Sequence, residues 1–450
     1  MDLSPEFLKR LQQDYPLDYA KRLAAFSDSL GVSVNRHPRK YTAAFRSQAL
    51  PWNESGILLQ ERPAFVYDPW FHGGAYYVQE AGSQLAGKLF SMLEIPEHPL
   101  VLDLCAAPGG KTVHLANLLA GRGVLVSNEP IKTRVGVLQE NLSKAGWDNC
   151  IITQSDPSVF QGLEALFDVI LVDAPCSGEG MFRKSEEARE HWSPDLVRFC
   201  AARQHRLLED IWPALKPGGF LLYSTCTLNQ QENEAQLDAL LKHPDAKTVA
   251  VKLPDTWGLA EGKSDTSCWY NWPGNAGGEG FFLGLVQKKG QADEQREPSK
   301  TSSQKRKETT RPVWLADTAH LVDMEGSLFA ISEAALRPSG QLKPVRVIHA
   351  GTRVGAFIGD KFKPDPELAL SVHFNTEKTA ALNLDEAVAF LCGDGILPET
   401  ATEGWNAVSY EGLPLGWINH LGRRSNNLWP QPWRIRQRPK GDLPTPFWQS

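Results

Sequence analysis

Two cysteine-bearing motifs, at residues 167–180 and 216–227, contain the residue types that can do covalent chemistry. FDVILVDAPCSGEG places Asp173 and Cys176 just after an apolar run, and KPGGFLLYSTCT places Cys226 after another. A thiolate is a strong nucleophile, and a nearby cation or helix N-terminus favours it over the thiol. A lone cysteine is more often a small core residue, so we interpret the other five cysteines in that way.

A third motif, VLDLCAAPGGKT at residues 101–112, predicts a cofactor loop. An apolar segment is followed by small residues and then by Gly109, Gly110 and Lys111, where a helix is expected to begin. Small residues let the backbone approach a ligand, and the first turn of a helix offers free N–H groups. The motif matches neither the G-x-G-x-x-G turn nor the G-x-x-x-x-G-K-[ST] loop. Hydride transfer and nucleotide hydrolysis are therefore disfavoured.

Acidic residues follow the next two apolar segments. Glu129 comes after GVLVSN, and Asp156 lies in ITQSDPSVF. Ligands of an open α/β sheet bind outside the carboxyl ends of its strands, where an acid can hold ribose hydroxyls. Acids at successive strand ends, without a diphosphate-binding turn, predict an adenosine-type pocket. S-adenosylmethionine fits that description.

A thiol, a carboxylic acid and a methyl donor together indicate methylation at carbon 5 of a pyrimidine. Carbon 5 of cytosine is a poor nucleophile until a thiolate adds at carbon 6 and makes the ring enamine-like. Asp173 suits the place of an acid at cytosine N3, where charge develops during the addition. A second thiol can assist when the C5 proton and the first thiol leave. The residues alone leave open which of Cys176 and Cys226 is the nucleophile.

These motifs need a sheet that brings their ends together. Four short apolar runs, at residues 99–104, 123–128, 167–174 and 219–226, are rich in Val, Ile and Leu. Such runs are typical of parallel strands buried on both faces. Helical stretches alternate with them, and this alternation predicts a doubly wound, Rossmann-like α/β sheet. The expected helices include Thr112–Leu119, Lys132–Ala145 and Pro194–Leu215.

A polar stretch, residues 288–312, predicts a linker. It contains no large apolar residue, so it cannot bury enough surface to offset the entropy lost on ordering. It separates a C-terminal region, residues 313–450, from the body of the chain. Within the body we expect an N-terminal module at residues 1–93, which begins with two amphipathic helices, and a catalytic domain at residues 94–287.

The composition is that of a globular protein, with 450 residues, 42% hydrophobic and 22% charged. No apolar run approaches the roughly 18 residues that span a bilayer, and no secretory signal is visible, so we expect no membrane partner. The seven cysteines are scattered, without a Cys-x-x-Cys pair. This favours a reducing, cytoplasmic compartment and disfavours a metal site. Without a long heptad pattern, we expect a monomer.

Positive charge is concentrated near the C-terminus, although the net charge is -6. Residues 421–440 contain six basic residues and no acidic one, with Trp429 and Trp433 among them. Cations interleaved with aromatic rings suit a phosphate backbone and stacked bases. A solvated face is the plain alternative. A second basic stretch, residues 29–53, contains Arg36, Arg39, Lys40 and Arg46.

Several blocks of the sequence stand out together: VLDLCAAPGGKT, DAPCSGEGMFRK, HWSP, LKPGGFLLYSTCT and NQQENE, with GAYYVQEAGSQLAG upstream. They resemble the NOL1/NOP2/Sun family of RNA 5-methylcytosine methyltransferases, over about residues 1–286. Residues 412–436, GLPLGWINHLGRRSNNLWPQPWRIR, are similar to the end of the RsmF-type subgroup of bacterial 16S rRNA cytosine methyltransferases. In that subgroup, a PUA-like RNA-binding module follows the methyltransferase body.

The resemblance implies a class I methyltransferase sheet between a small N-terminal α+β RNA-binding module and a C-terminal PUA-like region. It implies that Cys226 is the nucleophile and that Cys176 helps to release the product. The implied substrate is 16S rRNA, as naked RNA or within the 30S subunit. Glu129 stands where many relatives have Asp and keeps the two acceptor oxygens. The implied S-adenosylmethionine contacts are Cys105, Ala106, Ala107, Pro108, Gly109, Gly110, Lys111, Glu129, Asp156 and Asp173.

Three alternatives remain at this point. The same chemistry can act on tRNA, because nothing in the catalytic motifs distinguishes the two RNAs. A ribosome-assembly factor that binds RNA without catalysis is disfavoured because Asp173, Cys176 and Cys226 are all present. A redox protein that uses the two cysteines as a dithiol is disfavoured by the methyl-donor loop. In the leading interpretation the target base is single-stranded or flipped out, because a stacked cytosine cannot present carbon 6 to a thiol.

Overall fold

The computed structural model describes residues 3–28, 30–43, 48–291, 310–377 and 379–449. Most of the predicted linker, residues 292–309, and Arg46 of the second basic stretch lie outside the described residues. Within the described ranges, no helix is long and apolar enough to cross a membrane. No cluster of three or more His, Cys, Asp and Glu in these ranges is placed to hold a metal ion.

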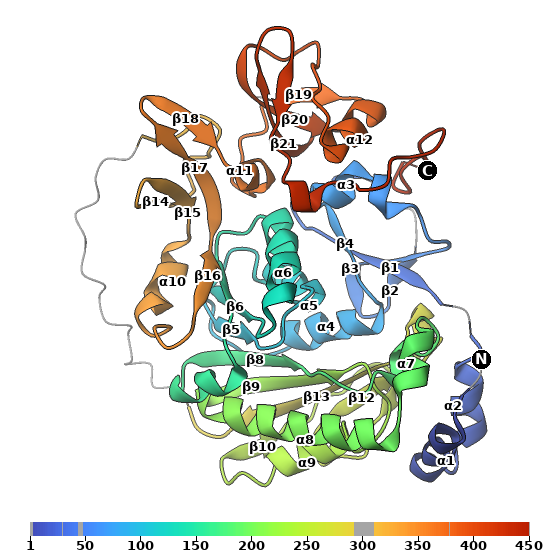
Figure 1. Cartoon of the computed structure of the whole chain (residues 1–450). Helices are drawn as coiled ribbons and strands as arrows, with labels where there is room; N and C mark the ends of the chain where they lie inside the picture. The colour runs from blue at the N-terminus through green and yellow to red at the C-terminus, as the bar shows by residue number, and fades with distance from the viewer. Residues whose placement is uncertain (1–2, 29, 44–47, 292–309, 378, 450) are drawn as a thin grey trace.

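A large mixed sheet lies at the centre of the molecule (Figure 1). Its order across the described residues is β11 (Ala260–Glu261), β12 (Cys268–Asn271), β13 (Phe281–Lys288), β9 (Leu215–Thr225), β8 (Phe167–Asp173), β5 (Leu100–Asp103), β6 (Val124–Asn128), β7 (Cys150–Thr153) and β16 (Val347–Ala350), with β10 (Ala246–Thr248) paired to β13. The strands from β9 to β7 are parallel. Every residue of β6 and β7 is buried, as the continuous apolar runs predict.

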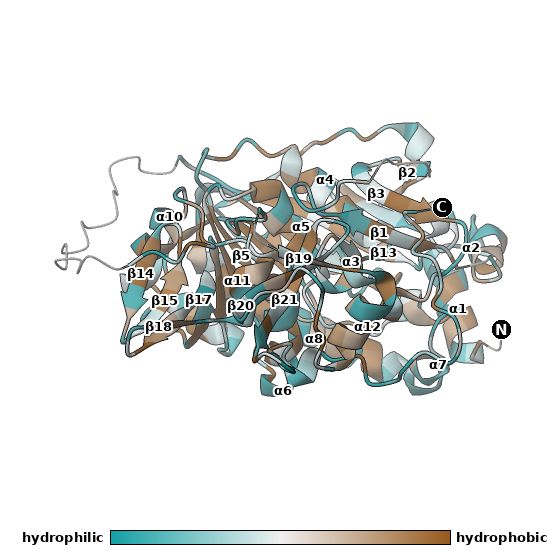
Figure 2. Ribbon diagram, turned by 90° about the horizontal axis from the view of Figure 1, so that it is seen from above, coloured by the Kyte–Doolittle hydropathy of each residue, from teal (hydrophilic) through white to brown (hydrophobic). Residues whose placement is uncertain are grey.

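Helices cover both faces of this sheet, which confirms the doubly wound prediction (Figure 1). Figure 2 shows hydrophobic residues on the strands around β5 and hydrophilic residues on the outer side of α6. One face carries α4 (Leu85–Ser91), α5 (Gly110–Leu119) and α6 (Lys132–Ala145), and the other carries α8 (Pro194–Ile211) and α9 (Glu234–Leu240).

The helix α8 ends earlier than the sequence suggested. We predicted a helix to Leu215, but α8 ends at Ile211 and a short 3-10 turn follows. Pro213 explains the difference, because proline has no N–H to donate to the preceding turn of the helix. Strand β9 then begins at Leu215, four residues before the predicted run at 219.

The N-terminal part of the chain contacts the central sheet in two separate places (Figure 1). Helix α1 (Pro5–Asp14) buries Phe7 against Phe182 and Trp192, beside α7. A small sheet instead lies on the side of α4 and α5, where it contacts both helices. The remaining elements are α2 (Tyr19–Ala25), α3 (Pro69–His72), α7 (Glu186–His191) and the sheet β2 (Gln48–Leu50), β3 (Asn53–Leu59), β1 (Val32–Arg36), β4 (Tyr76–Val78).

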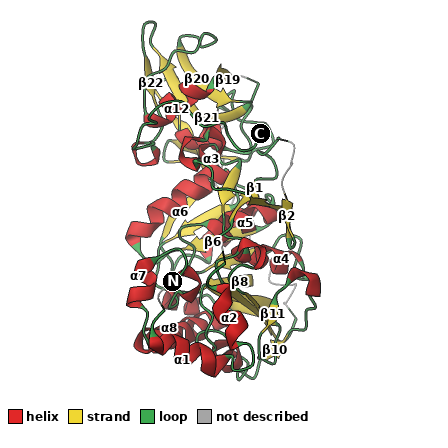
Figure 3. Cartoon of the chain, turned by 90° about the vertical axis from the view of Figure 1, so that its right-hand side faces the viewer, coloured by secondary structure: helices red, strands yellow, loops and turns green. Residues whose placement is uncertain are grey.

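The C-terminal region forms two small sheets and also extends the central one. Strand β16 pairs antiparallel with β7 at the edge of the central sheet. Figure 3 shows the sheet that contains β19 to β22 at one end of the molecule, with α1 and α8 at the other. The elements are β14 (Leu321–Met324), β15 (Ser327–Ala330), β17 (Thr352–Ile358), β18 (Lys361–Pro364), then β19 (Thr379–Leu382), β20 (Gly404–Tyr410), β21 (Leu413–His420), β22 (Ser425–Asn427), with α10 (Glu333–Leu336), α11 (Pro366–Leu370) and α12 (Leu384–Cys392).

A buried ion pair fastens the C-terminal region to the central sheet. His349 Nε2 of β16 lies 3.3 Å from Glu367 Oε2 of α11, and both side chains are less than a tenth exposed. Ser143 of α6 donates a hydrogen bond to the same carboxylate. Burial alone would lower the pKa of His349, but the hydrogen bond and charge of Glu367 outweigh burial and raise it. The pair therefore stabilises the junction most when His349 is protonated.

This ion pair predicts a pH-dependent contribution to stability. A His whose pKa is raised in the folded state stabilises the protein fully below its unfolded pKa of about 6.5 and loses this effect as pH rises through the folded pKa. We expect His349→Gln to lower the free energy of unfolding by on the order of 1 kcal/mol more at pH 6 than at pH 8.5. Urea denaturation at the two pH values measures this difference, and substitution of the exposed His98, His98→Gln, is the control. An equal loss at both pH values contradicts the assignment.

Candidate active site

The two motif cysteines lie side by side, beyond the carboxyl ends of β8 and β9. These strands are parallel neighbours, and Asp173 of β8 pairs in register with Ser224 of β9. Cys176 and Cys226 follow the two strands closely, and their Sγ atoms are 3.2 Å apart. Both are free, half-buried thiols. The sheet thus brings together two side chains that are 50 positions apart in the sequence.

The surroundings of the two sulfur atoms differ. The hydrogen bond with Cys226, burial and the charge of Cys226 raise the pKa of Cys176 well above its usual value, so Cys176 is held as a thiol. Burial would lower the pKa of Lys111, but the charges of Asp173 and Cys226 outweigh it and raise that pKa. This arrangement suits Cys226 as the attacking sulfur and Cys176 as its hydrogen-bond donor.

Asp173 is oriented by two donors. Lys111 Nζ lies 2.9 Å from Asp173 Oδ2, and Ser224 Oγ donates to Oδ1 at 2.8 Å. The Asp173 side chain is still 34% exposed, so its carboxylate remains available to a ligand. Because Asp173 begins the loop that carries Cys176, it places an acid close to the two sulfur atoms.

A pocket with about 570 Å³ of empty space opens beside the cofactor loop. The predicted cofactor residues that line it are Cys105, Ala106, Ala107, Pro108, Gly110, Lys111 and Asp173. The structure therefore gathers most of the predicted set around one concave space.

One buried atom shows that this pocket fits a ligand with a hydrogen-bond donor. Asp103 lines the pocket, and its Oδ1 is buried without a hydrogen-bond partner, whereas Oδ2 accepts from Thr112. Burial raises the pKa of Asp103 to about 7, and the nearby charge of Asp173 adds to the rise. A buried acceptor without a partner is costly, so a bound ammonium or hydroxyl group would stabilise this site. The amino acid portion of S-adenosylmethionine carries such a group.

Three predicted cofactor residues do not line this pocket. Gly109 adopts a left-handed conformation just before α5 and shapes the loop. Glu129 is buried, and its carboxylate accepts hydrogen bonds from the backbone N–H groups of Ala107 and Ile131. Asp156 is exposed and caps the turn that follows β7, where it accepts from Ser158. Their roles in binding stay predictions.

The sequence prediction missed one wall of the pocket. That wall is β4 and the loop after it, which contribute Tyr77, Val78, Gln79, Glu80 and Ser83. The segment belongs to the block GAYYVQEAGSQLAG, which supported the resemblance but contains no residue type that indicates a ligand by itself. Its distance from the cofactor loop in the chain hid the contact.

The structure corrects the interpretation of residues 421–440 as a surface of alternating cations and aromatic rings. Trp429 is only 1% exposed, because it packs against Phe390 and Trp433 in the core of the β19–β22 sheet. It cannot stack on a base. Arg438 is occupied by an ion pair with Asp394. The exposed cations of this stretch are Arg423, Arg424, Arg436, Arg438 and Lys440.

The cations of the second basic stretch are also less available to bind RNA than the composition suggested. Lys40 is half-buried and donates to the backbone carbonyls of Gly73, Lys144 and Leu370. Arg36 donates to the carbonyls of Glu54 and Ser55. These side chains join parts of the protein to one another and are not free for a polyanion.

Two family models match this chain. Residues 90–287 match the model described as 16S rRNA methyltransferase RsmB/F, and residues 377–435 match the one described as Methyltransferase RsmF PUA domain. The first match spans the parallel strands, the pocket loop and both motif cysteines. The second spans the sheet β19 to β22 and α12.

Solved structures resemble the central part of the chain. A methyltransferase homolog protein from Pyrococcus horikoshii is 28% identical, with a TM-score of 0.54, over 63% of this chain and 95% of that one. The structure titled NSun6 from Pyrococcus horikoshii with SFG has the same TM-score at 17% identity, over 64% of this chain and 99% of that one. The latter likeness supports the fold alone.

Curated relatives cover nearly the whole chain. Ribosomal RNA small subunit methyltransferase F of Aeromonas hydrophila is 34% identical over 85% of this chain and 84% of the relative. The protein of the same name from Shewanella loihica is 30% identical over 96% of this chain and 95% of the relative. With both family models and this coverage, the chain belongs to the ribosomal RNA small subunit methyltransferase F family.

Proposed function

We propose that this methyltransferase transfers a methyl group from S-adenosylmethionine to carbon 5 of a cytosine in 16S rRNA, through a covalent adduct with Cys226. One observation supports the mechanism above all others. Two thiols lie 3.2 Å apart, and the oriented Asp173 begins the loop that carries Cys176 and also lines the cofactor pocket. The names and coverage of the curated relatives support the RNA.

S-adenosylmethionine is the methyl donor of this methyltransferase, and the pocket beside the cofactor loop has the donors and acceptors to hold it. Asp103 offers its buried, unpaired oxygen to the amino group. Cys105 to Pro108, Gly110, Lys111 and Tyr77 line the pocket, and Glu129 holds the loop by accepting from the N–H of Ala107. When bound, the cofactor supplies the methyl group that carbon 5 accepts.

The protein's own residues perform the rest of the reaction. Cys226 attacks carbon 6 as a thiolate, and Asp173, acting as an acid, donates a proton to N3, where negative charge develops. After the methyl transfer, water takes the proton from C5, the electrons of the C5–H bond re-form the C5=C6 double bond, and the C6–S bond breaks. Cys226 leaves as a thiolate, and N3 returns its proton to Asp173. Cys176, still a thiol, donates a hydrogen bond to the departing sulfur and so helps release.

The RNA must bring a single cytosine out of its stack to reach the sulfur atoms. The cost of flipping is roughly a few kcal/mol, which contacts elsewhere on the RNA offset. We assign these contacts to the N-terminal module and to the β19–β22 sheet, whose exposed cations include Arg423, Arg424 and Arg436. We further propose that the protein acts as a monomer in the cytoplasm, on naked 16S rRNA or on the 30S subunit.

Substitution of the two cysteines separates their roles. We expect Cys226→Ala to abolish methyl transfer, because the sulfur that attacks carbon 6 is removed. Cys176→Ala should instead accumulate a covalent RNA–protein adduct, since release is slowed while attack is retained. Methyl transfer from labelled cofactor and a denaturing gel measure both effects. Activity near wild type in Cys226→Ala would refute the nucleophile assignment, and an absent adduct in Cys176→Ala would refute the release role.

Asp103 allows a test of the cofactor site that needs no RNA. We expect Asp103→Asn to weaken S-adenosylmethionine binding about tenfold, because a hydrogen bond to a charged group is lost. Wild-type affinity should rise between pH 6 and pH 7.5, as Asp103 with its pKa of about 7 loses its proton. Titration calorimetry measures both, and the exposed Asp255→Asn is the control. A pH-independent wild-type affinity, or an unchanged affinity in Asp103→Asn, contradicts the assignment.

A further inference from the structure

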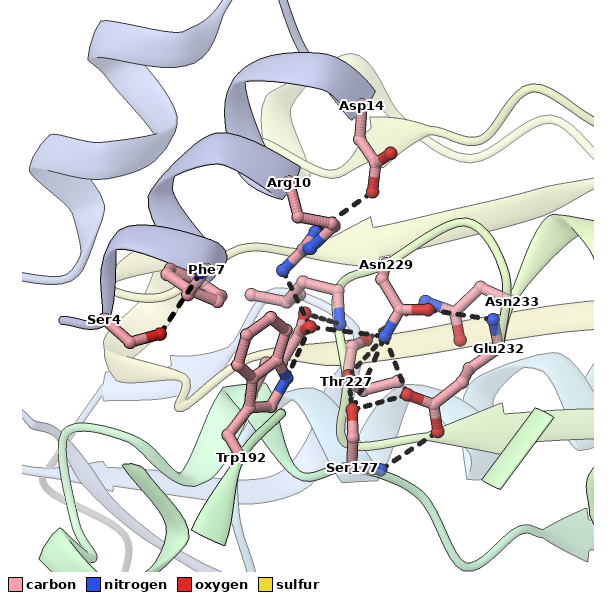
Figure 4. A network of polar contacts seen from close by, with 12 residues as sticks. Ser4, Phe7, Arg10, Asp14, Ser177, Trp192, Thr227, Asn229, Glu232 and Asn233 are labelled. Atoms are coloured by element: carbon pink, nitrogen blue, oxygen red, sulfur yellow. Dashed lines mark hydrogen bonds and ion pairs between the residues drawn. The ribbon is translucent and has the colours of Figure 1, made fainter. Parts of the chain in front are cut away.

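Two buried carboxylates, Glu179 and Glu232, cross-link the loops that carry the motif cysteines. Figure 4 shows Glu232 with its neighbours Ser177 and Asn229. Glu179 follows Cys176 in the chain, yet its Oε2 accepts from the N–H of Leu228, in the loop of Cys226, at 3.0 Å. Glu232 follows Cys226, yet its Oε2 accepts from the N–H of Ser177 at 2.9 Å. Each loop therefore supplies the carboxylate that holds the other, and both side chains are fully buried.

Neutral side chains complete this network. Asn229 donates to Glu179 at 3.3 Å and to Glu232 at 2.7 Å, so one amide bridges the two carboxylates. Gln204 of α8 donates to Glu232 at 2.8 Å and to the carbonyl of Pro175, next to Cys176, at 3.0 Å. Buried hydrogen-bond networks of this kind fix their members in one arrangement. Here they fix the spacing of the two sulfur atoms.

A cation reaches this network from the far N-terminal end of the chain. Arg10 of α1 places Nη2 at 2.7 Å from Glu179 Oε1, and its side chain is only 12% exposed. Its Nη1 pairs with Asp14 of the same helix at 3.1 Å. Trp192 Nε1 donates to Glu179 as well. Within the described residues, Arg10 is the cation that forms an ion pair with Glu179. Without Arg10, the fully buried carboxylate of Glu179 has no opposite charge beside it.

The helix α1 is held in place independently of this ion pair. Phe7 packs against the rings of Phe182 and Trp192, and Ser4 caps the helix (Figure 4). Tyr15, which follows α1, donates to the carbonyl of Leu228 at 2.9 Å. None of the residues from 4 to 15 lines the cofactor pocket. Arg10 is thus placed to act on the cysteine loops without touching the cofactor.

We propose that Arg10 is a positioning residue for the reaction: through Glu179, it sets the spacing of Cys176 and Cys226. Breaking a buried ion pair by removing one partner leaves an uncompensated charge, which the structure relieves by moving Glu179 or admitting water. Either change loosens the contact with Leu228, two residues after Cys226. The inference deepens the proposed function. Its expected effect on kcat rests on that function, because it assumes that the two cysteines take part in the reaction.

The kinetic test compares Arg10→Met with two matched variants at a temperature where all are folded. Lys9→Met removes an exposed charge from the same helix, and Leu11→Ala loosens the packing of α1 at a buried residue that has no polar contact with Glu179. We expect Arg10→Met to lower kcat about tenfold, with KM for S-adenosylmethionine within about twofold of wild type. Its covalent RNA adduct should accumulate, as release slows. If Leu11→Ala at the same loss of Tm lowers kcat equally, the role is only structural and the proposal is wrong.

Two further variants test whether the charge is responsible. Arg10→Met/Glu179→Gln removes both charges, so we expect it to recover part of the kcat lost in Arg10→Met, and Arg10→Lys should recover part through its remaining ammonium. No recovery in either contradicts the proposal.

A measurement on the protein without RNA distinguishes a failure of this proposal from a failure of the proposed function. Diamide oxidises neighbouring thiols to a disulfide, and mass spectrometry quantifies the Cys176–Cys226 product. We expect Arg10→Met to form it several-fold more slowly than wild type and Lys9→Met to form it at the wild-type rate. An unchanged rate in Arg10→Met overturns the positioning role. A wild-type protein that methylates no cytosine overturns the proposed function instead, and leaves the disulfide result to decide the role of Arg10.

Discussion

The parallel pairing of β8 with β9 is the constraint on which the site depends. Parallel neighbours end at the same edge of a sheet, so whatever follows them is brought together regardless of distance along the chain. The in-register pair Asp173 and Ser224 fixes the starting points of both loops. From there, each cysteine is only a few residues away, and the contact of the two sulfur atoms follows. A register shift between these strands would separate the thiols and release Asp173 from Ser224.

Buried charge explains why distant parts of the chain contact the loops of the two cysteines. Glu179 and Glu232 are both inaccessible to water, and burial raises the pKa of Glu232. A carboxylate in such a place needs hydrogen bonds or a cation. The hydrogen bonds come from the two loops and α8, whereas the cation comes from α1. The N-terminal helix therefore belongs energetically to the catalytic centre, although it lies far from it in the sequence.

The sequence predicted the features that depend on local patterns. Continuous apolar runs indicated the parallel strands, and the Pro-Cys and Thr-Cys motifs indicated the two cysteines that these strands bring together. Features that depend on distant packing were missed or misread. Trp429 looked like an exposed aromatic residue in a basic stretch, but it is buried among Phe390 and Trp433. No local signal indicated that Tyr77 faces the cofactor loop, since a tyrosine in a short strand has no special spacing to reveal its partner.

The central claim, cytosine C5 methylation of 16S rRNA, is tested most directly by bisulfite mapping of RNA from cells with and without the gene for this protein. The account predicts that a 5-methylcytosine signal in 16S rRNA disappears when the gene is deleted and returns with the wild-type gene but not with Cys226→Ala. An unchanged 16S rRNA pattern would contradict the account. If a tRNA signal disappears instead, the chemistry stands and the assignment of the RNA is wrong.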